Sequence, residues 1–270
     1  MSRPDYTAYA NLRGLNWGTL REMQHSPKHF HHRLTTPLED SPSMATGRLI
    51  HTAVLEPELL DEVYAIWEGG RRGTNAYKAW VEEEAMGKEE VTRAEYENAL
   101  ACSAAVWAHR KARQVLAGGR TEVSLCWIDP ETHMYCKARP DHLKRTGALT
   151  DLKSSTGTLD AREFGRNAAK LGYHGQLGYY HRGLRILGYP EAPVRIVHVE
   201  QKPPHDVAVY TIPEYVLDAG EQLAITLMKE VQLWRSRGRW PGHAEDEQPI
   251  QFPDWALPAI TYTDEIEVLL

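Results

Sequence analysis

The sequence predicts an α/β fold, with a mixed five-stranded sheet flanked by helices and an N-terminal helical region. Two observations lead to this prediction. After residue 118, several short segments alternate apolar and polar residues with the period of two that is typical of half-buried strands. Before residue 118, and again over 160–187 and 213–237, apolar residues recur at helical spacing.

The length and composition bound the organisation of the chain. With 270 residues, 42% of them hydrophobic, the chain can bury a substantial core. We expect one domain over 1–270. Within it, residues 1–118 form a mainly helical wall of a cleft, 119–240 an α/β core, and 241–270 an irregular C-terminal tail.

The cysteine spacing, the length of the apolar runs and the net charge exclude several classes of protein. The three cysteines show no Cys-x-x-Cys spacing, which argues against a disulfide scaffold, structural zinc and a four-cysteine iron–sulfur cluster. No run approaches the roughly 18 apolar residues of a membrane span, and no signal segment opens the chain, so we expect a soluble cytoplasmic protein without a membrane partner. The formal net charge of −6 means that any contact with nucleic acid needs a local positive groove.

The first 43 residues contain one predicted helix. Residues 1–15 are polar and are expected to be loose, whereas 16–24 read as a helix with Asn16 as its N-cap and Ser26-Pro27 as its stop. Residues 33–43 read as a loop that contains proline. Three histidines precede this loop, but no carboxylate or cysteine stands at ligand spacing, so a zinc site is not expected there: His29, His31 and His32.

A second predicted helix carries a histidine beside apolar residues. The segment 47–55 has helical spacing and ends before Pro57, with His51 near its middle. A histidine in such a place is commonly a packed, hydrogen-bonded residue. If the fold brings it near acidic side chains, its neutral imidazole can instead complete a metal shell or hold a metal-bound water.

The segment 69–75 reads as a mobile loop because it combines three glycines with Arg71 and Arg72. The two arginines are candidates for clamping DNA phosphates, and a solvated surface loop is the equal alternative. Residues 76–118 are expected to be largely helical, with Thr92 as an N-cap and Glu95 in the capping-box position.

The strand pattern begins after residue 118. Segments 122–127 and 134–143 alternate around the turn 129–132, which predicts a β-hairpin leading to Asp141, and 148–153 forms the neighbouring strand. Glu122 opens the first strand. It is either a further metal carboxylate or a charge that protects a sheet edge from aggregation.

The remaining elements follow the same patterns. Gln176 and Tyr180 stand four residues apart in a helix and therefore share one face. The predicted elements are a helix over 160–187 broken near Gly172, strands over 194–200 and 207–212, a long helix over 213–237, and an irregular tail packed on the body through Trp240-Pro241-Gly242 and Pro253-Asp254-Trp255.

The chemistry is concentrated in 139–153. Asp151 and Lys153 stand two apart in a strand, so both point to the face that we expect Asp141 to share. Carboxylates of this kind suit one or two Mg²⁺ ions, with Mn²⁺ as a substitute, and a nearby ammonium can orient a water. The plainer alternative is a solvated strand end with a weak ion pair. Arg139 shares the strand face of Asp141, where it contacts either a phosphate or a carboxylate.

Pro140-Asp141 followed by Asp151-Leu152-Lys153 resembles the PD-(D/E)XK nuclease superfamily. Along nearly the whole chain the sequence is similar to RecE-type exonucleases, the nuclease domain of exonuclease VIII, which are distant relatives of lambda exonuclease. The family helix usually opens with two serines where this chain has Asn16 and Gly18, a difference that concerns only the start of the helix. The matching segments are Leu20, 26–30, 47–51, 55–57, Glu122, Trp127, 139–141, 151–153, 172–176, Tyr180 and 240–242.

The resemblance implies roles for these residues. Asp141, Asp151 and the Leu152 carbonyl would bind the metal, His51 would join or support its shell, and Lys153 would be catalytic. Gln176 and Tyr180 match the family's Gln-x-x-x-Tyr motif, which borders the active site and the DNA.

The resemblance also implies an activity and partners. We expect a 5′ to 3′ exonuclease on linear double-stranded DNA that leaves 3′ overhangs for phage-type recombination, a homo-oligomeric ring, and a single-strand annealing partner of the RecT/Bet type. The alternatives are an endonuclease or single-strand nuclease of the same superfamily, or a catalytically dead DNA-binding module.

Overall fold

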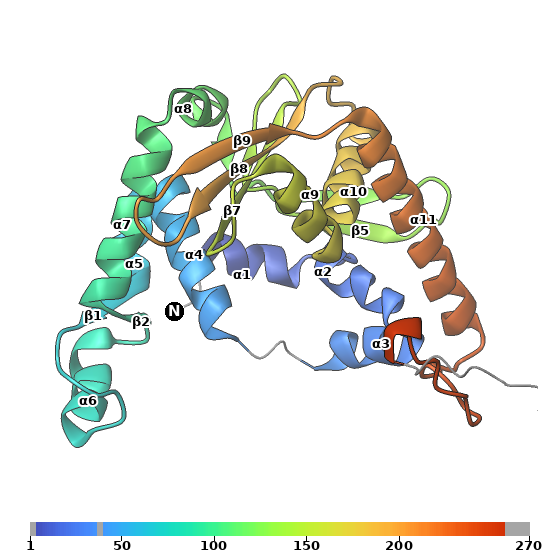
Figure 1. The fold of residues 1–270 in the computed structure, drawn as a ribbon, viewed down its shortest axis with the longest axis horizontal. Helices are drawn as coiled ribbons and strands as arrows, with labels where there is room; N and C mark the ends of the chain where they lie inside the picture. Colours follow the sequence, from blue (N-terminus) through green and yellow to red (C-terminus); the bar gives the residue numbers. More distant parts are fainter. Residues whose placement is uncertain (1–3, 37–39, 257–270) are drawn as a thin grey trace, which may run out of the picture.

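A five-stranded sheet with the order β3-β6-β7-β8-β9 lies at the centre of the protein in the computed structural model, which describes residues 4–36 and 40–256 (Figure 1). β7 and β8 run parallel, and the other neighbouring pairs run antiparallel. The predicted α/β fold with a mixed five-stranded sheet is therefore confirmed. The strands of this sheet are β3 (Arg120–Thr121), β6 (His142–Leu143), β7 (Leu149–Ser155), β8 (Val194–Glu200) and β9 (Val207–Thr211).

Helices surround the sheet, and two small two-stranded sheets stand apart from it (Figure 1). The α-helices are α1 (Pro4–Asn11), α2 (Trp17–Leu20), α3 (Pro27–Thr35), α4 (Pro42–Leu55), α5 (Leu60–Val63), α6 (Asn75–Trp80), α7 (Arg93–Ala108), α8 (Arg110–Leu116), α9 (Ala161–Lys170), α10 (Tyr173–Ile186) and α11 (Glu214–Ser236). Short 3-10 or π turns are η1 (Arg21–Gln24), η2 (Pro57–Leu59), η3 (Val81–Ala85) and η4 (Asp254–Ala256). None of the helices in the described part of the chain is long and apolar enough to cross a membrane.

The alternation of side chains along β7 and β8 divides the core in two. Leu149 and Ile196 face one hydrophobic cluster, together with residues of α10 and α11. Leu152 and Val197 face a second cluster, which contains residues of α4, α7 and α8. Because both faces are covered, the central strands are buried on both sides, as is usual in α/β proteins.

The N-terminus is more ordered than the sequence predicts. Residues 4–11 form α1, where we expected a loose segment, so that expectation is wrong. The reason lies far along the chain: the buried ammonium of Lys137 donates to the carbonyls of Tyr9, Ala10 and Leu12, at 2.9–3.1 Å. A cation at this position satisfies the open carbonyls at the helix end, and no local pattern indicates it.

The predicted helix starts and breaks are largely correct. The side chain of Asn16 caps α2, Thr92 and Glu95 form the capping box of α7, and Gly172 (φ 72°) separates α9 from α10. Ser26 does end the first helical stretch, but its side chain also caps α3, which places the three histidines on a helix.

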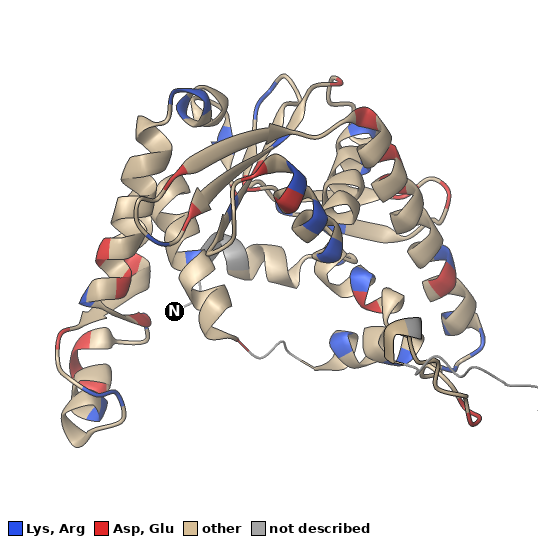
Figure 2. Cartoon of the chain, in the orientation of Figure 1, with Lys and Arg blue, Asp and Glu red and all other residues tan. Residues whose placement is uncertain are grey.

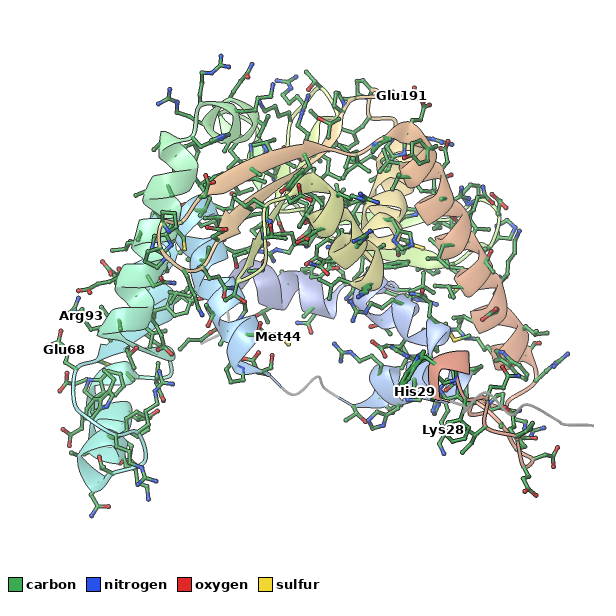
Figure 3. All side chains as sticks on the ribbon, viewed as in Figure 1. Lys28, His29, Met44, Glu68, Arg93 and Glu191 are labelled. Carbon is green, nitrogen blue, oxygen red and sulfur yellow. The ribbon has the colours of Figure 1, made fainter. Side chains whose placement is uncertain are left out.

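The segment 76–118 is less helical than expected, because β2 (Glu89–Thr92) lies within it and pairs in parallel with β1 (Tyr64–Trp67). Neither strand was predicted. β2 contains two glutamates and one apolar residue, so it has little of the alternation that marks a strand. The ion pair between Arg93 and Glu68 joins the ends of this small sheet (Figure 3).

The predicted hairpin forms but is shorter than expected. β4 (Leu125–Ile128) pairs with β5 (Tyr135–Ala138) apart from the central sheet, and the expected strand 134–143 is interrupted after Ala138. The interruption coincides with Pro140, which has no N–H to give to a ladder. After this break the chain continues as β6, which joins the central sheet.

A buried cation links the hairpin turn to α10 and α11. The guanidinium of Arg182 lies 2.5 Å from Asp129, 3.1 Å from Glu131 and 2.8 Å from Glu221. Because Arg182 is 6% exposed, removing any one of its buried partners would leave charge without compensation.

The C-terminal tail packs on the body only in part. The Trp240 ring lies 5.5 Å from Phe30 and 5.2 Å from His31, as measured between ring centroids. Trp255 is 87% exposed, so the expectation that it packs on the body is wrong. Residues 257–270 lie outside the described part of the chain.

Candidate metal centre

Strand β7 places Asp151 and Lys153 side by side. The Lys153 Nζ lies 2.7 Å from Asp151 Oδ2, and Asp151 is 1% exposed. Apart from this ion pair, neither Asp151 oxygen accepts a well-aligned hydrogen bond from any residue that the structure describes. A buried carboxylate with unused lone pairs is unusual, and it fits a site that a cation completes.

Asp141 reaches the same place from the loop before β6. Its Oδ2 accepts a hydrogen bond of 2.7 Å from the backbone N–H of Leu152, which lies between Asp151 and Lys153. Burial raises the pKa of Asp141 to about 8, and the neighbouring Asp151 carboxylate adds to this rise. A bound cation would favour the ionised carboxylate.

Glu122 stands beside Asp141 with an unusual backbone. Its φ of 51° lies in the left-handed region that residues other than glycine seldom adopt, and its N–H donates to the Asp141 carbonyl at 2.9 Å. Glu122 lies just beyond β3, so it does not begin a long strand as expected. Its carboxylate lies 2.7 Å from Arg139 Nε. Burial raises the pKa of Glu122, and the Asp141 carboxylate raises it further.

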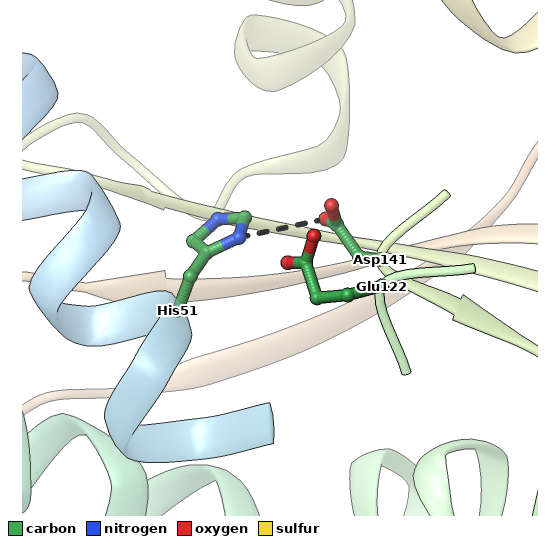
Figure 4. Close-up of side chains that lie close together, drawn as sticks. All are labelled: His51, Glu122 and Asp141. Atoms are coloured by element: carbon green, nitrogen blue, oxygen red, sulfur yellow. Dashed lines mark ion pairs between the residues drawn. The ribbon is translucent and has the colours of Figure 1, made fainter. Parts of the chain in front are cut away.

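His51 approaches from α4, on the opposite side of the site (Figure 4). Its Nδ1 lies 3.7 Å from Asp141 Oδ2. His51, Glu122 and Asp141 offer ligand atoms within 4.8 Å of one another. Burial lowers the pKa of His51, and the charge of Lys153 lowers it further, which favours the neutral imidazole that metals bind.

Helix α10 supplies a line of polar side chains behind Lys153. The Lys153 ammonium donates to Gln176 Oε1 at 3.3 Å, and the Gln176 amide donates to the Tyr180 hydroxyl at 3.2 Å. The sequence predicted that Gln176 and Tyr180 share one helix face, and this contact confirms it. Burial raises the pKa of Tyr180 well above its usual value, and Asp151 adds to the rise.

Tyr173 is a site residue that the sequence analysis did not assign. Its ring centroid lies 4.6 Å from the Lys153 ammonium, which is close enough for a cation–π contact. A sequence signal exists, because Tyr173 stands three residues before Gln176 at the start of α10 and therefore shares its face. No pattern in the sequence, however, joins that helix face to β7.

The donor set fits a divalent cation. Carboxylate oxygens and one imidazole suit Mg²⁺ or Mn²⁺. The Leu152 backbone N–H bonds to Asp141, and ligation of the cation by the Leu152 carbonyl stays a prediction. Burial tends to lower the pKa of Lys153, but the charges of Asp151 and Asp141 outweigh burial and raise it.

The three arginines proposed for DNA contact lie in different surroundings. Arg139 is 8% exposed and pairs with Glu122, the alternative left open by the sequence. Arg71 and Arg72 lie in the exposed loop between β1 and α6, where Arg72 pairs with Glu95 at 2.9 Å. Arg72 therefore makes its ion pair with Glu95 and not with the carboxylates of the site. Contact of Arg71 and Arg72 with phosphate stays a prediction.

A comparison with known protein families shows which family this chain belongs to. Residues 17–251 match the family described as "PDDEXK-like domain of unknown function (DUF3799)". The chain belongs to this PDDEXK-like family. The predicted relation to the PD-(D/E)XK nuclease superfamily is therefore confirmed, and the structure brings its motif residues Asp141, Asp151 and Lys153 together.

One solved structure supports the same fold. A crystal structure from Eubacterium rectale, described as "Putative exonuclease", has a TM-score of 0.65 with this PDDEXK-like chain at 15% identity, over 93% of this chain and 96% of that one. At this identity the likeness shows a shared fold. A second structure, SSO0001, covers 70% of this chain and 90% of its own at 15% identity, with a TM-score of 0.28 that carries no argument. No curated protein matches the chain.

Proposed function

We propose that this protein is a divalent-metal-dependent exonuclease of the RecE type, which digests linear double-stranded DNA from 5′ to 3′ and leaves 3′ overhangs. One observation carries the nuclease proposal: Asp141, Asp151 and Lys153 converge in a partly buried site, and the buried oxygens of Asp151 have unused lone pairs. A purely structural ion pair has no need of a second, half-buried carboxylate, which raises the electrostatic cost of the site.

The residues divide the work of phosphodiester hydrolysis. Asp141 and Asp151 would hold the cation, with support from His51, Glu122 and the Leu152 carbonyl. When bound, the cation supplies positive charge for the phosphate oxygens and acidifies a water. Lys153 places its ammonium beside Asp151, where it can hold a water or a phosphate oxygen, and Gln176 fixes its direction.

Polarity, assembly and partners come from the resemblance to RecE-type exonucleases. On that basis we propose a homo-oligomeric ring around DNA and cooperation with a single-strand annealing protein of the RecT/Bet type in the cytoplasm. The description of the Eubacterium rectale protein as a "Putative exonuclease" agrees with digestion from a DNA end.

The deciding experiment uses linear duplex labelled at the 5′ or the 3′ end, a covalently closed circle of the same sequence, and single-stranded DNA. Each substrate is incubated with Mg²⁺ and, separately, with EDTA. We expect Mg²⁺-dependent release of 5′-terminal nucleotides from linear duplex and an intact circle.

Each of the other possible outcomes of this experiment would indicate one of the alternative functions. Cleavage of the circle would replace the exonuclease by an endonuclease, and exclusive cleavage of single strands would change the substrate. DNA binding without cleavage of any substrate would leave a binding module with an inactive site. Full activity in EDTA would overturn the metal assignment.

A further inference from the structure

Helix α9 carries a row of cations on its surface. Arg162, Arg166 and Lys170 follow at intervals of four residues, and all three are exposed. Neighbours at this spacing lie about 6 Å apart along the helix axis and share one side of it. Figure 2 shows the row as blue segments along α9. The ion pairs found among the described residues include none that these three side chains make.

One acidic residue interrupts the row. Glu163 is the sole carboxylate within α9 and projects from the same side of the helix, so three positive charges and one negative charge leave this face with a net charge of +2. Elsewhere exposed arginines are neutralised, as Arg72 is by Glu95 and Arg93 by Glu68. The cations of α9 therefore remain available for a partner.

The other side of α9 fixes its place relative to the metal centre. Phe164 is buried, and its ring centroid lies 4.7 Å from that of His198 and 4.4 Å from that of Tyr210. His198 on β8 is the register partner of Lys153 on β7. Paired residues of adjacent strands project from the same face of a sheet. Helix α9 thus lies over the sheet face from which Lys153 projects.

The end of α9 also leads directly into the site. The helix finishes at Lys170, and after Gly172 the chain turns into Tyr173, whose ring contacts the Lys153 ammonium. Helix α9 therefore packs through Phe164 on the sheet face of Lys153, and the chain after it reaches Lys153 through Tyr173. The row of cations lies on the outer side of this helix.

We propose that Arg162, Arg166 and Lys170 bind the phosphate backbone of the DNA duplex and hold it beside the metal centre. This inference rests on the proposed function for its substrate. The row spans about 12 Å, over which one strand of a duplex presents about three phosphates. Since the protein carries a net charge of −6, attraction to DNA has to come from a local surface of this kind.

The test compares two triple variants with the same change in charge. The first is R162Q/R166Q/K170Q, which keeps good helix formers in α9. The control is R110Q/K111Q/R113Q on α8, whose three cations are also exposed. Binding to a linear duplex is measured in EDTA, so that no bond is cut, over a series of NaCl concentrations.

We expect the α9 variant to bind at least about tenfold more weakly at 0.1 M salt. The slope of log K against log salt should become about 3 units shallower, because each lost phosphate contact removes roughly 0.9. The α8 variant should keep the wild-type slope. Glu163→Gln should bind more tightly than wild type, an effect that misfolding does not produce.

Cleavage by the same proteins separates this inference from the proposed function. If wild type cuts DNA in Mg²⁺ and the α9 variant keeps its slope and its KM, the α9 surface is wrong and the nuclease stands. If wild type binds DNA with a slope that depends on α9 but cuts none, the nuclease fails and the surface stands. Equal losses in the α8 and α9 variants would also overturn the inference.

Discussion

The buried carboxylate of Asp151, the half-buried carboxylate of Asp141 and the Lys153 ammonium form the smallest unit of the site. The Asp151 carboxylate adds to the rise in the pKa of Asp141, and both carboxylates raise the pKa of Lys153. Replacing Asp151 therefore changes the pKa of both Asp141 and Lys153, so single substitutions need controls outside the group.

Replacing Lys153 tests its chemical role. We expect Lys153→Ala to reduce the rate of DNA cleavage by about 10² to 10⁴-fold, the usual contribution of a positioned water-orienting or proton-transfer group, while metal binding persists. Lys202→Ala, which changes an exposed lysine beyond β8, should cut at the wild-type rate. Single-turnover cleavage gives the rate, and a near-normal value for Lys153→Ala would remove it from the chemistry.

His51 is tested by separating activity from stability. If His51 contacts the metal or its water, His51→Ala should lower Mg²⁺-dependent cleavage much more than the melting temperature, and Mn²⁺ should restore part of the activity because it binds such sites more tightly. His32→Ala, an exposed histidine on α3, is the control. A variant that loses roughly 0.5–3 kcal/mol of stability but keeps its turnover would show that His51 only packs.

His198 should make the stability depend on pH. Burial lowers its pKa to about 4 in the folded protein, against about 6.5 in the unfolded chain. Between pH 7 and pH 5 the unfolded chain therefore binds a proton that the folded state does not. We expect the free energy of unfolding to fall by about 2 kcal/mol more in wild type than in His198→Asn. Urea unfolding at both pH values measures the difference, and equal losses would contradict it.

At the residue scale the sequence predicts part of the site. Asp151 and Lys153 follow from the period of a strand, and Asp141 follows from its motif spacing. The approach of His51 to Asp141 cannot be predicted from local pattern, because ninety positions separate them and only the packing of α4 brings them together. The conformation of Glu122 was also missed, because alternation predicts an extended residue where the backbone is left-handed.

At the element scale, the crossing of α10 and α11 positions Gln176 and Tyr180. A Cβ on Gly178 would come within 2.4 Å of the Glu221 backbone nitrogen, so the two helix backbones approach closely at this point. Gly165 on α9 is a matched contrast, since nothing lies within 4 Å of its Cβ position.

The surroundings of Gly178 and Gly165 predict opposite effects on stability when each glycine is changed to alanine. Gly178→Ala should destabilise the protein by about 1–3 kcal/mol, the usual cost of overpacking, and lower activity by shifting α10. Gly165→Ala should stabilise it by about 0.5–1 kcal/mol because alanine favours the helix. Urea unfolding midpoints give both values, and a stabilised Gly178→Ala would refute the close approach.

Elements were predictable where their own residues carry the signal. The strand 194–200 and the helices on either side of Gly172 agree with the pattern, as does the long helix α11. Helix α1 and strand β2 were missed for a common reason. Each is stabilised by distant partners, the Lys137 ammonium for α1 and strand β1 for β2.

At the scale of the whole molecule, a bound cation should stabilise the fold. A ligand that binds only the folded state at a hundred times its Kd adds about 2.7 kcal/mol. We expect Mg²⁺ to raise the melting temperature of wild type and of Asp218→Ala, an exposed carboxylate on α11, but not that of Asp151→Ala. An equal rise in all three would place the ion elsewhere. Since this measurement needs no DNA, it tests the metal centre independently of activity.

The Arg182 cluster cannot be completed during synthesis until Glu221 has been made. Arg182 and its hairpin partners Asp129 and Glu131 leave the ribosome before Glu221, which follows 39 residues later. At about 5–20 residues per second, this interval lasts roughly 2–8 s. During it α10 lacks the helix that buries it. All of the motif residues are therefore synthesised before α11, and the apolar face of α10 that packs against α11 stays uncovered until α11 emerges.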